Sequence, residues 1–107
     1  MSRLSQSTFS RGVEAVARER GVPMRDILTG VGRRGAIGEA RQYLMWRLKR
    51  DGYSLQEIAR VFGLDDHTTV HHGVRAHAKR LAAEKTAEQY AEAIQELASD
   101  IVEASAW

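Results

Sequence analysis

The spacing of apolar residues restricts this chain to an all-α fold. Apolar side chains recur every three or four residues along most of the sequence, and no stretch shows the apolar–polar alternation of a half-buried strand. Gly21 and Gly52 follow two of these periodic stretches, where a helix commonly ends. Ser54 and Glu57 form a capping box that marks the start of another helix. We therefore expect a compact all-α domain of about six helices.

These helices are expected to share one core. A chain of 107 residues is of single-domain size, so 1–107 is interpreted as one domain with its core over about 9–82. The residues expected to be buried are Phe9, Val13, Val16, Ala17, Val22, Ile27, Leu28, Ile37, Ala40, Leu44, Leu48, Leu55, Ile58, Ala59, Phe62, Val70, Val74 and Leu81. Thr86 and Gln89 form a second capping box, which predicts a separate acidic terminal helix over about 86–104.

This predicted terminal helix is amphipathic. Tyr90, Ile94, Leu97 and Ile101 recur at helical spacing, and the acidic residues lie off that line. We expect the apolar side to pack on the rest of the domain, because amphipathic terminal helices usually complete a small core. In the alternative, the same side, or Trp107, binds a protein partner or a second copy of the chain.

The charged residues are distributed unevenly. Residues 1–82 carry fifteen Lys and Arg against eight Asp and Glu, a balance of +7, whereas residues 83–107 carry a balance of −5. A basic domain suits a polyanionic partner, because binding to phosphates releases condensed counterions. The alternative is a surface charge that serves only solubility. The acidic segment would repel DNA and should lie away from it.

Several classes of protein are disfavoured by composition. The chain has no cysteine, so no disulfide and no thiolate metal site can stabilise it. Its apolar runs are too short to span a membrane, and its N-terminal residues lack the apolar core of a secretory signal. We therefore expect a cytoplasmic protein without membrane contact.

The segment around residue 63 has the outline of a helix-turn-helix. A capped helix from Leu55 to about Phe62 is followed by the short turn Gly63–Leu64, and Asp65 or Asp66 can cap the next helix. The first turns of that second helix carry polar side chains where a recognition helix meets base edges. These residues are His67, Thr68, Thr69, His71, His72 and Arg75.

A glycine-rich loop is the other candidate contact. The segment 29–38 reads TGVGRRGAIG and contains the adjacent pair Arg33 and Arg34. Glycine allows close approach of the backbone to another surface, and two arginines can reach a groove or a phosphate. The alternative is a flexible exposed connection.

The stretch E-I-A-R-V-F-G-L-D-D-H-T-T-V-H-H resembles the C-terminal DNA-binding domain of the bacterial replication initiator DnaA, which has a Trp-repressor-like helix-turn-helix. The resemblance extends from about Phe9 to Leu97 and includes A-R-Q at 40–42. It implies that Asp66–Thr69 contact bases and phosphates in the major groove. It further implies that Arg41, with Gln42 beside it, approaches the DNA backbone, and that Arg33 or Arg34 enters the minor groove.

Two residues depart from the family pattern. Asp65 and Glu39 stand where relatives commonly carry arginine. A carboxylate at these positions would repel a phosphate, so the preferred DNA element can differ from that of the initiator.

Neither a metal site nor catalysis is expected. His67 and His71 lie four residues apart on one helical face, but no general-base Glu lies between them and no third ligand is evident. The glycine-rich loop lacks the Lys-Ser/Thr ending of a P-loop, and the initiator's ATPase domain is missing. We therefore expect a free-standing domain that is not an enzyme and requires no cofactor. The alternative is a fragment of a larger protein, against which the start at Met1 argues mildly.

The function predicted from the sequence is sequence-specific binding of double-stranded DNA. The element would resemble a DnaA box, and the protein would act at the nucleoid by regulating replication initiation or transcription. The alternative is an adaptor that keeps the fold but binds proteins, which Asp65 and Glu39 favour.

Overall fold

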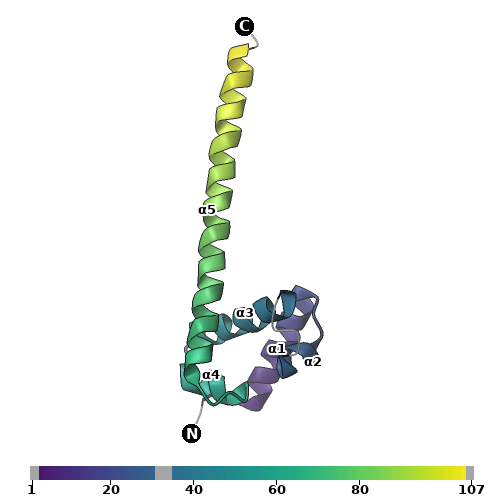
Figure 1. The fold of residues 1–107 in the computed structure, drawn as a ribbon. Coiled ribbons are helices and arrows are strands. Elements are labelled where there is room, and N and C mark those ends of the chain that lie inside the picture. Colours follow the sequence, from purple (N-terminus) through teal and green to yellow (C-terminus); the bar gives the residue numbers. More distant parts are fainter. Residues whose placement is uncertain (1–2, 31–34, 106–107) are drawn as a thin grey trace.

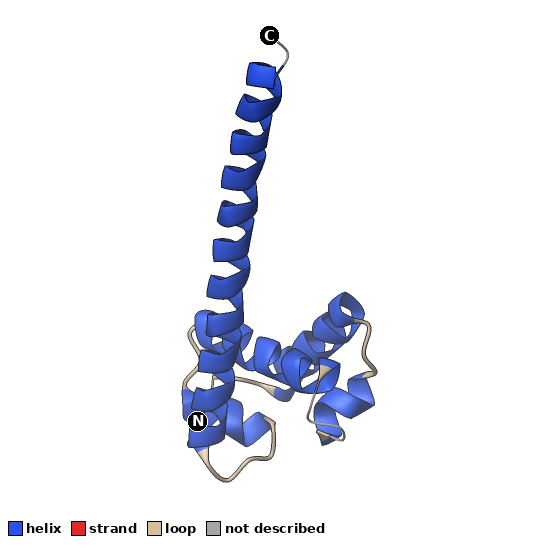
Figure 2. Cartoon of the chain, turned by 45° about the horizontal axis from the view of Figure 1, so that its top comes forward, coloured by secondary structure: helices blue, strands red, loops and turns tan. Residues whose placement is uncertain are grey.

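In the computed structural model, which describes residues 3–30 and 35–105, four helices form a cluster beside the N-terminal part of a long fifth helix, with the third and fourth helices against it and the first two farther away (Figure 1). The helices are α1 (Gln6–Arg20), α2 (Met24–Thr29), α3 (Ala36–Arg50), α4 (Leu55–Val61) and α5 (His67–Ser105). Figure 2 shows the same cluster from another side, and no strand occurs within the described ranges. The predicted all-α class is confirmed, with five helices among these residues rather than the six expected.

Local capping sets the bounds of the short helices. The Ser5 hydroxyl accepts a hydrogen bond from the Thr8 N–H at 3.1 Å, and the Ser54 hydroxyl accepts one from the Glu57 N–H at 3.1 Å. Each bond satisfies a backbone donor that the first turn of a helix would otherwise leave unpaired. Gly21 ends α1 in the left-handed conformation, with φ of 66°, which a residue with a Cβ adopts at a cost.

The core consists mainly of the predicted apolar residues. Phe9, Val13, Val16, Ile27, Ala40, Leu44, Leu48, Ile58, Ala59, Phe62 and Val70 are all buried. Two predictions are wrong, because Leu28 and Leu81 are 49% and 37% exposed. Leu4 is buried without having been predicted, and its carbonyl accepts a hydrogen bond from Arg60 at 2.9 Å. Since Leu4 precedes the first helix, no helical periodicity includes it.

Helix α3 is held against α1 by a polar cluster at their surface. The Tyr43 hydroxyl donates to Glu19 at 2.8 Å, and the Arg47 guanidinium donates to the same carboxylate at 3.1 Å. The hydrogen bond from Tyr43, and then the charge of Arg47, lower the pKa of the Glu19 carboxyl against the opposing effect of desolvation. The carboxylate is thereby kept ionised between its two donors.

Close packing against α3 fixes the position of the N-terminal part of α5. Helix α5 contacts α3 most extensively and α4 next. A Cβ added at Gly73 would lie 2.6 Å from the Met45 sulfur, so glycine is what permits this approach. Val70, one helical turn earlier, is fully buried. The start of α5 therefore packs closely on α3 at Gly73.

His77 lies where α5 begins to separate from the other helices. It is 3% exposed, and its ring centroid is 5.0 Å from that of Tyr43 and 5.1 Å from that of Trp46. Burial, followed by the charges of Arg80 and Arg20, lowers the pKa of His77, so the ring packs in its neutral form.

A separate terminal helix over 86–104 is not observed. Helix α5 runs without interruption to Ser105, and the Thr86 hydroxyl donates to the Ala82 carbonyl at 2.9 Å instead of capping a new helix. From Val74 onward the sequence contains neither glycine nor proline and is rich in alanine, so nothing ends the helix at residue 86. The prediction of a restart is therefore wrong.

The C-terminal part of α5 projects away from the other helices (Figure 1). Tyr90 and Ile94 are 69% and 50% exposed, so the prediction that this segment packs on the rest of the domain is wrong. The molecule measures 70 × 25 × 22 Å, and its radius of gyration is 19.0 Å. A wholly globular chain of this length would have a radius of about 13 Å. No helix in the described ranges is both long and apolar enough to cross a membrane.

Candidate nucleic-acid interface

The turn between α4 and α5 is fixed by the Phe62 ring and by backbone hydrogen bonds. Phe62 is 8% exposed and meets Phe9 edge to face, with ring centroids 5.0 Å apart. Gly63 has a φ of 70°, and the Leu64 N–H donates to the Ala59 carbonyl at 2.8 Å. A left-handed glycine followed by this bond reverses the chain within a few residues. The predicted helix-turn-helix outline is thus present.

Asp66 caps the second helix of this motif. Its carboxylate accepts a hydrogen bond from the Thr68 N–H at 2.9 Å, which decides between the two aspartates that the sequence left open. The backbone bond from Thr68, then the Thr68 hydroxyl, and then the neighbouring His67 lower the pKa of the Asp66 carboxyl. The start of α5 therefore carries a side chain that is ionised at neutral pH and already oriented.

Acid is expected to remove the stabilisation that Asp66 provides. The pKa of Asp66 is lower in the folded state than in the unfolded state. Its ionised carboxylate therefore stabilises the folded state at pH values above the ordinary carboxyl pKa of about 3.9, and this stabilisation is lost as the pH falls through the lower pKa of the folded state. Urea unfolding of Asp66→Asn at successive pH values should show a weaker loss of stability below about pH 4. Asp65→Asn, the matched control, should keep the wild-type dependence, and an Asp66→Asn profile as steep as wild type would contradict the assignment.

The predicted contact residues on α5 are accessible. The side chains of Asp66 and His67 are 66% and 54% exposed. The exposed set comprises Asp66, His67, Thr68, Thr69, His71, His72 and Arg75. A surface that must enter the major groove has to be open to solvent in this way.

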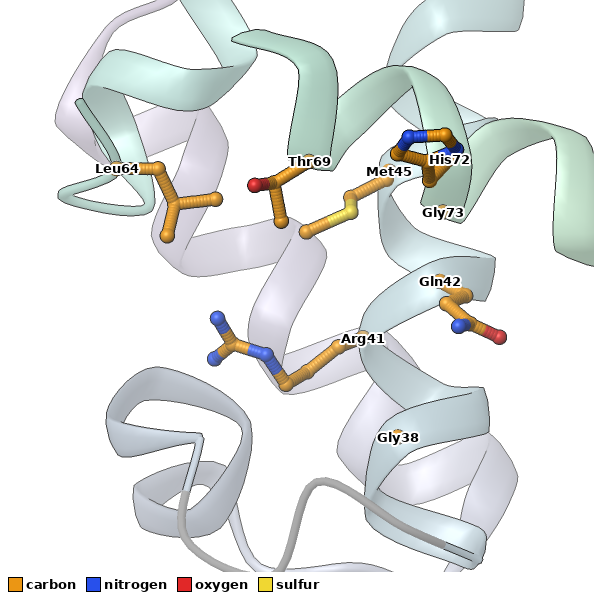
Figure 3. A pocket seen from close by; sticks show the side chains of 8 residues that line it. All are labelled: Gly38, Arg41, Gln42, Met45, Leu64, Thr69, His72 and Gly73. Atoms are coloured by element: carbon orange, nitrogen blue, oxygen red, sulfur yellow. The ribbon is translucent and has the colours of Figure 1, made fainter. Parts of the chain in front are cut away.

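A cavity of about 190 Å³ lies between α3 and the start of α5 (Figure 3). It brings Arg41 and Gln42 of α3 together with Thr69 and His72 of α5, four residues that the sequence analysis proposed separately. The complete lining is Gly38, Arg41, Gln42, Met45, Leu64, Thr69, His72 and Gly73. Met45 and Leu64 were not among the predicted site residues. Met45 is an apolar residue of a helix and Leu64 an apolar residue of the turn, and neither carries a polar group that would indicate a contact with a ligand.

Arg41 is buried rather than presented to solvent. It is 8% exposed and donates to the Ile27 carbonyl, and its guanidinium carbon lies 5.1 Å from the centroid of the Phe62 ring. A Cβ added at Gly30 would lie 3.2 Å from the same carbon. Arg41 therefore joins the end of α2 to the helix-turn-helix, and its contact with DNA stays a prediction.

The remaining sequence predictions concern residues that do not line this cavity. Arg33 and Arg34 lie outside the described residues. Asp65 and Glu39, which depart from the family pattern, are both exposed.

Within the described part of the chain, no three His, Asp or Glu side chains converge on a point that could hold a metal ion. The rings of His71 and His72 lie 6.2 Å apart.

Comparison with known families agrees with this geometry. Residues 13–76 match the family model of the bacterial DnaA protein helix-turn-helix. The match covers more than half of the chain, from within α1 to the first ten residues of α5, and excludes the projecting part of α5. No curated protein and no solved structure is similar enough to this chain to count as a match.

Proposed function

Because this chain belongs to the bacterial DnaA helix-turn-helix family, whose members bind DNA, we propose that it reads a short duplex element similar to the DnaA box. The observation that carries the proposal is the exposed Asp66–Thr69 turn at the front of α5, inside the segment matched by the family. The family is a DNA-binding one rather than a catalytic one, which argues against an enzyme.

Each residue of this turn has chemistry suited to base or phosphate contact. The Asp66 carboxylate can accept a hydrogen bond from a cytosine amino group, and His67 can donate to N7 or O6 of a purine. Thr68 and Thr69 offer hydroxyls to phosphate and methyls to thymine. Their N–H groups lie at a helix N-terminus, where an anion is favoured. The adjoining cavity brings Gln42 and His72 to the same edge of the domain.

Occupation of such elements would regulate replication initiation or transcription. A protein with this role acts at the nucleoid, where its DNA partner lies. The net positive balance of residues 1–82 supports DNA as the ligand, and the acidic projecting segment points away from α4 and the start of α5 (Figure 1).

Selection from a random duplex pool, followed by titration at two salt concentrations, tests this proposal. We expect one enriched element resembling the DnaA box, bound more tightly than a shuffled duplex, with affinities that fall steeply as salt rises. Enrichment of no element, with equal affinity for both duplexes, would overturn it.

The second candidate function is that of an adaptor which binds proteins through the same fold. The exposed carboxylates of Asp65, next to Asp66 in the chain, and of Glu39 favour it because they repel phosphate. Absence of binding to any duplex at low salt would support the adaptor and exclude the DNA proposal.

Arg75 is expected to contribute charge rather than specificity. Arg75→Gln should weaken binding to the selected element and to shuffled DNA by similar factors, and should reduce the slope of log affinity against log salt by about 1. Lys85→Gln removes the same charge from the projecting part of α5 and should leave the slope unchanged. Equal slopes for Arg75→Gln and wild type would exclude phosphate contact by Arg75.

A further inference from the structure

The projecting part of α5 carries an apolar face without a partner among the described residues. Tyr90 and Ile94 are 69% and 50% exposed, and the sequence continues their spacing with Leu97 and Ile101. These four positions, here called the apolar seam, are separated by four, three and four residues. That is the spacing of a and d positions in a coiled coil. Single exposed apolar residues need no explanation, but a regular line of them does.

The apolar seam has the residue types of a two-stranded parallel coiled coil. With Ile94 at position a, Leu97 falls at d and Ile101 at the next a. A β-branched residue at a with leucine at d favours parallel dimers. In the sequence, the adjoining e and g positions include Ala91 and Ala93, which are small and uncharged and so allow close approach of a second helix.

The apolar seam lies on the side of α5 opposite to the one that packs on the rest of the domain, so a second helix can bind there. Val70, Val74 and His77 mark the side of α5 that packs on the rest of the domain. With about 3.6 residues per turn, the apolar seam lies roughly 160° round α5 from that side. A helix pairing with the seam therefore does not meet α3 or α4 of its own chain.

The charges favour a second copy of this chain as the occupant. The b, f and c positions of the heptad are occupied by Glu88, Glu92 and Glu96. Side chains at these positions face away from a partner helix, so they would not form ion pairs with a basic protein bound at the apolar seam. In a parallel pair, Lys79 at position g, just before the paired segment, would face the second copy's Glu84 at position e, at the start of that segment, and symmetry would make this contact twice. Both residues are exposed in the single chain and available for it.

We propose that residues 83–105 of α5 pair with the same residues of a second copy in a parallel coiled coil, so that the protein carries two helix-turn-helix units. The paired segment would be about 34 Å long. Binding of one unit to DNA would raise the effective concentration of the other at a neighbouring site. The self-association itself rests on the apolar seam and not on the identity of the DNA element.

The molar mass of the full chain in solution tests the pairing. Analytical ultracentrifugation should find a dimer for the wild type, and Ile94→Asp should weaken it at least tenfold by placing a charge at the apolar seam. Gln95→Asp adds the same charge one residue later, at a b position, and should remain dimeric. Because Ile94 is half exposed, the variant should keep the wild-type helical circular dichroism signal. A monomeric wild type, or equal effects of both variants, would overturn the proposal.

The orientation is tested by disulfide cross-linking. The chain has no cysteine, so an introduced one is unique. Ala83→Cys, at a d position, should form an intermolecular disulfide readily, because the two d residues of a parallel pair are adjacent. In an antiparallel pair centred on the apolar seam, position 83 of one chain and position 83 of the other would be roughly 35 Å apart. Ala82→Cys, at an outward c position, is the control. Absence of cross-linking in Ala83→Cys, or equal cross-linking in both, would overturn the parallel arrangement.

Salt dependence separates a second copy from a basic protein partner. Screening of the acidic segments should strengthen self-association as salt rises, whereas association with a basic partner would weaken. Failure of this dimer leaves the DNA proposal intact, because DNA binding is measured with separate variants. Dimerisation that weakens with added salt would contradict an interface stabilised mainly by the apolar seam.

Discussion

Replacement of Phe62 by alanine is expected to lower the free energy of unfolding by about 3–5 kcal/mol. The Phe62 ring is nearly buried, meets Phe9 at 5.0 Å and lies 5.1 Å from the Arg41 guanidinium, so its loss opens a cavity at the turn between α4 and α5. A small domain has a total stability of only about 5–15 kcal/mol, so much of this variant would be unfolded on mild denaturation. Urea unfolding followed by circular dichroism measures the effect.

Leu28→Ala provides the control for this variant. Leu28 is apolar but 49% exposed, so its truncation should change the free energy of unfolding by no more than about 1 kcal/mol. If the two variants lost similar stability, Phe62 would not be the residue that holds the turn.

Thr69→Ala is expected to reduce discrimination between the selected element and a shuffled duplex by about 1–3 kcal/mol, a factor of about 5 to 150 in relative affinity. Thr69 is exposed, lies in the first turn of α5 and lines the cavity shared with α3. Loss of its hydroxyl and methyl removes contacts that depend on the bases or their phosphates. Fluorescence anisotropy with both duplexes at one salt concentration measures the change.

Thr86→Ala is the matched control for that measurement. It removes the same side-chain atoms from an exposed position of the same helix, in the projecting segment outside the family match. Its DNA discrimination should equal that of the wild type. Unchanged discrimination in a folded Thr69→Ala protein would remove Thr69 from the contact surface.

For a variant of Arg41, DNA affinity has to be measured together with the stability of the fold. Its guanidinium bonds to the Ile27 carbonyl and packs on Phe62, so Arg41→Ala leaves a buried acceptor without this donor. Weaker DNA binding by Arg41→Ala would therefore combine lost folding with any lost phosphate contact. Arg75 and Thr69, which are exposed, separate these effects.

Elements whose causes are local could be predicted from the sequence. Helix starts follow from capping residues such as Ser54, helix ends from glycines such as Gly21, and buried positions from the spacing of apolar residues. These signals act within one or two turns of a helix, so they can be recognised without knowledge of the partner elements. The exposed Asp66–Thr69 turn belongs to this group, because its cap lies two residues from its donor.

The tertiary structure alone decided two features. Arg41 is buried because it bonds to the Ile27 carbonyl, 14 residues earlier in the chain, and packs on Phe62, at the end of α4. The spacing of apolar residues in the sequence cannot predict contacts between residues so far apart in the chain. The continuity of α5 was decided in the same way. With no contact from α1–α4 to bend the chain at Thr86, helix propagation through alanine-rich sequence outweighed the capping box, and Tyr90 and Ile94 were left exposed.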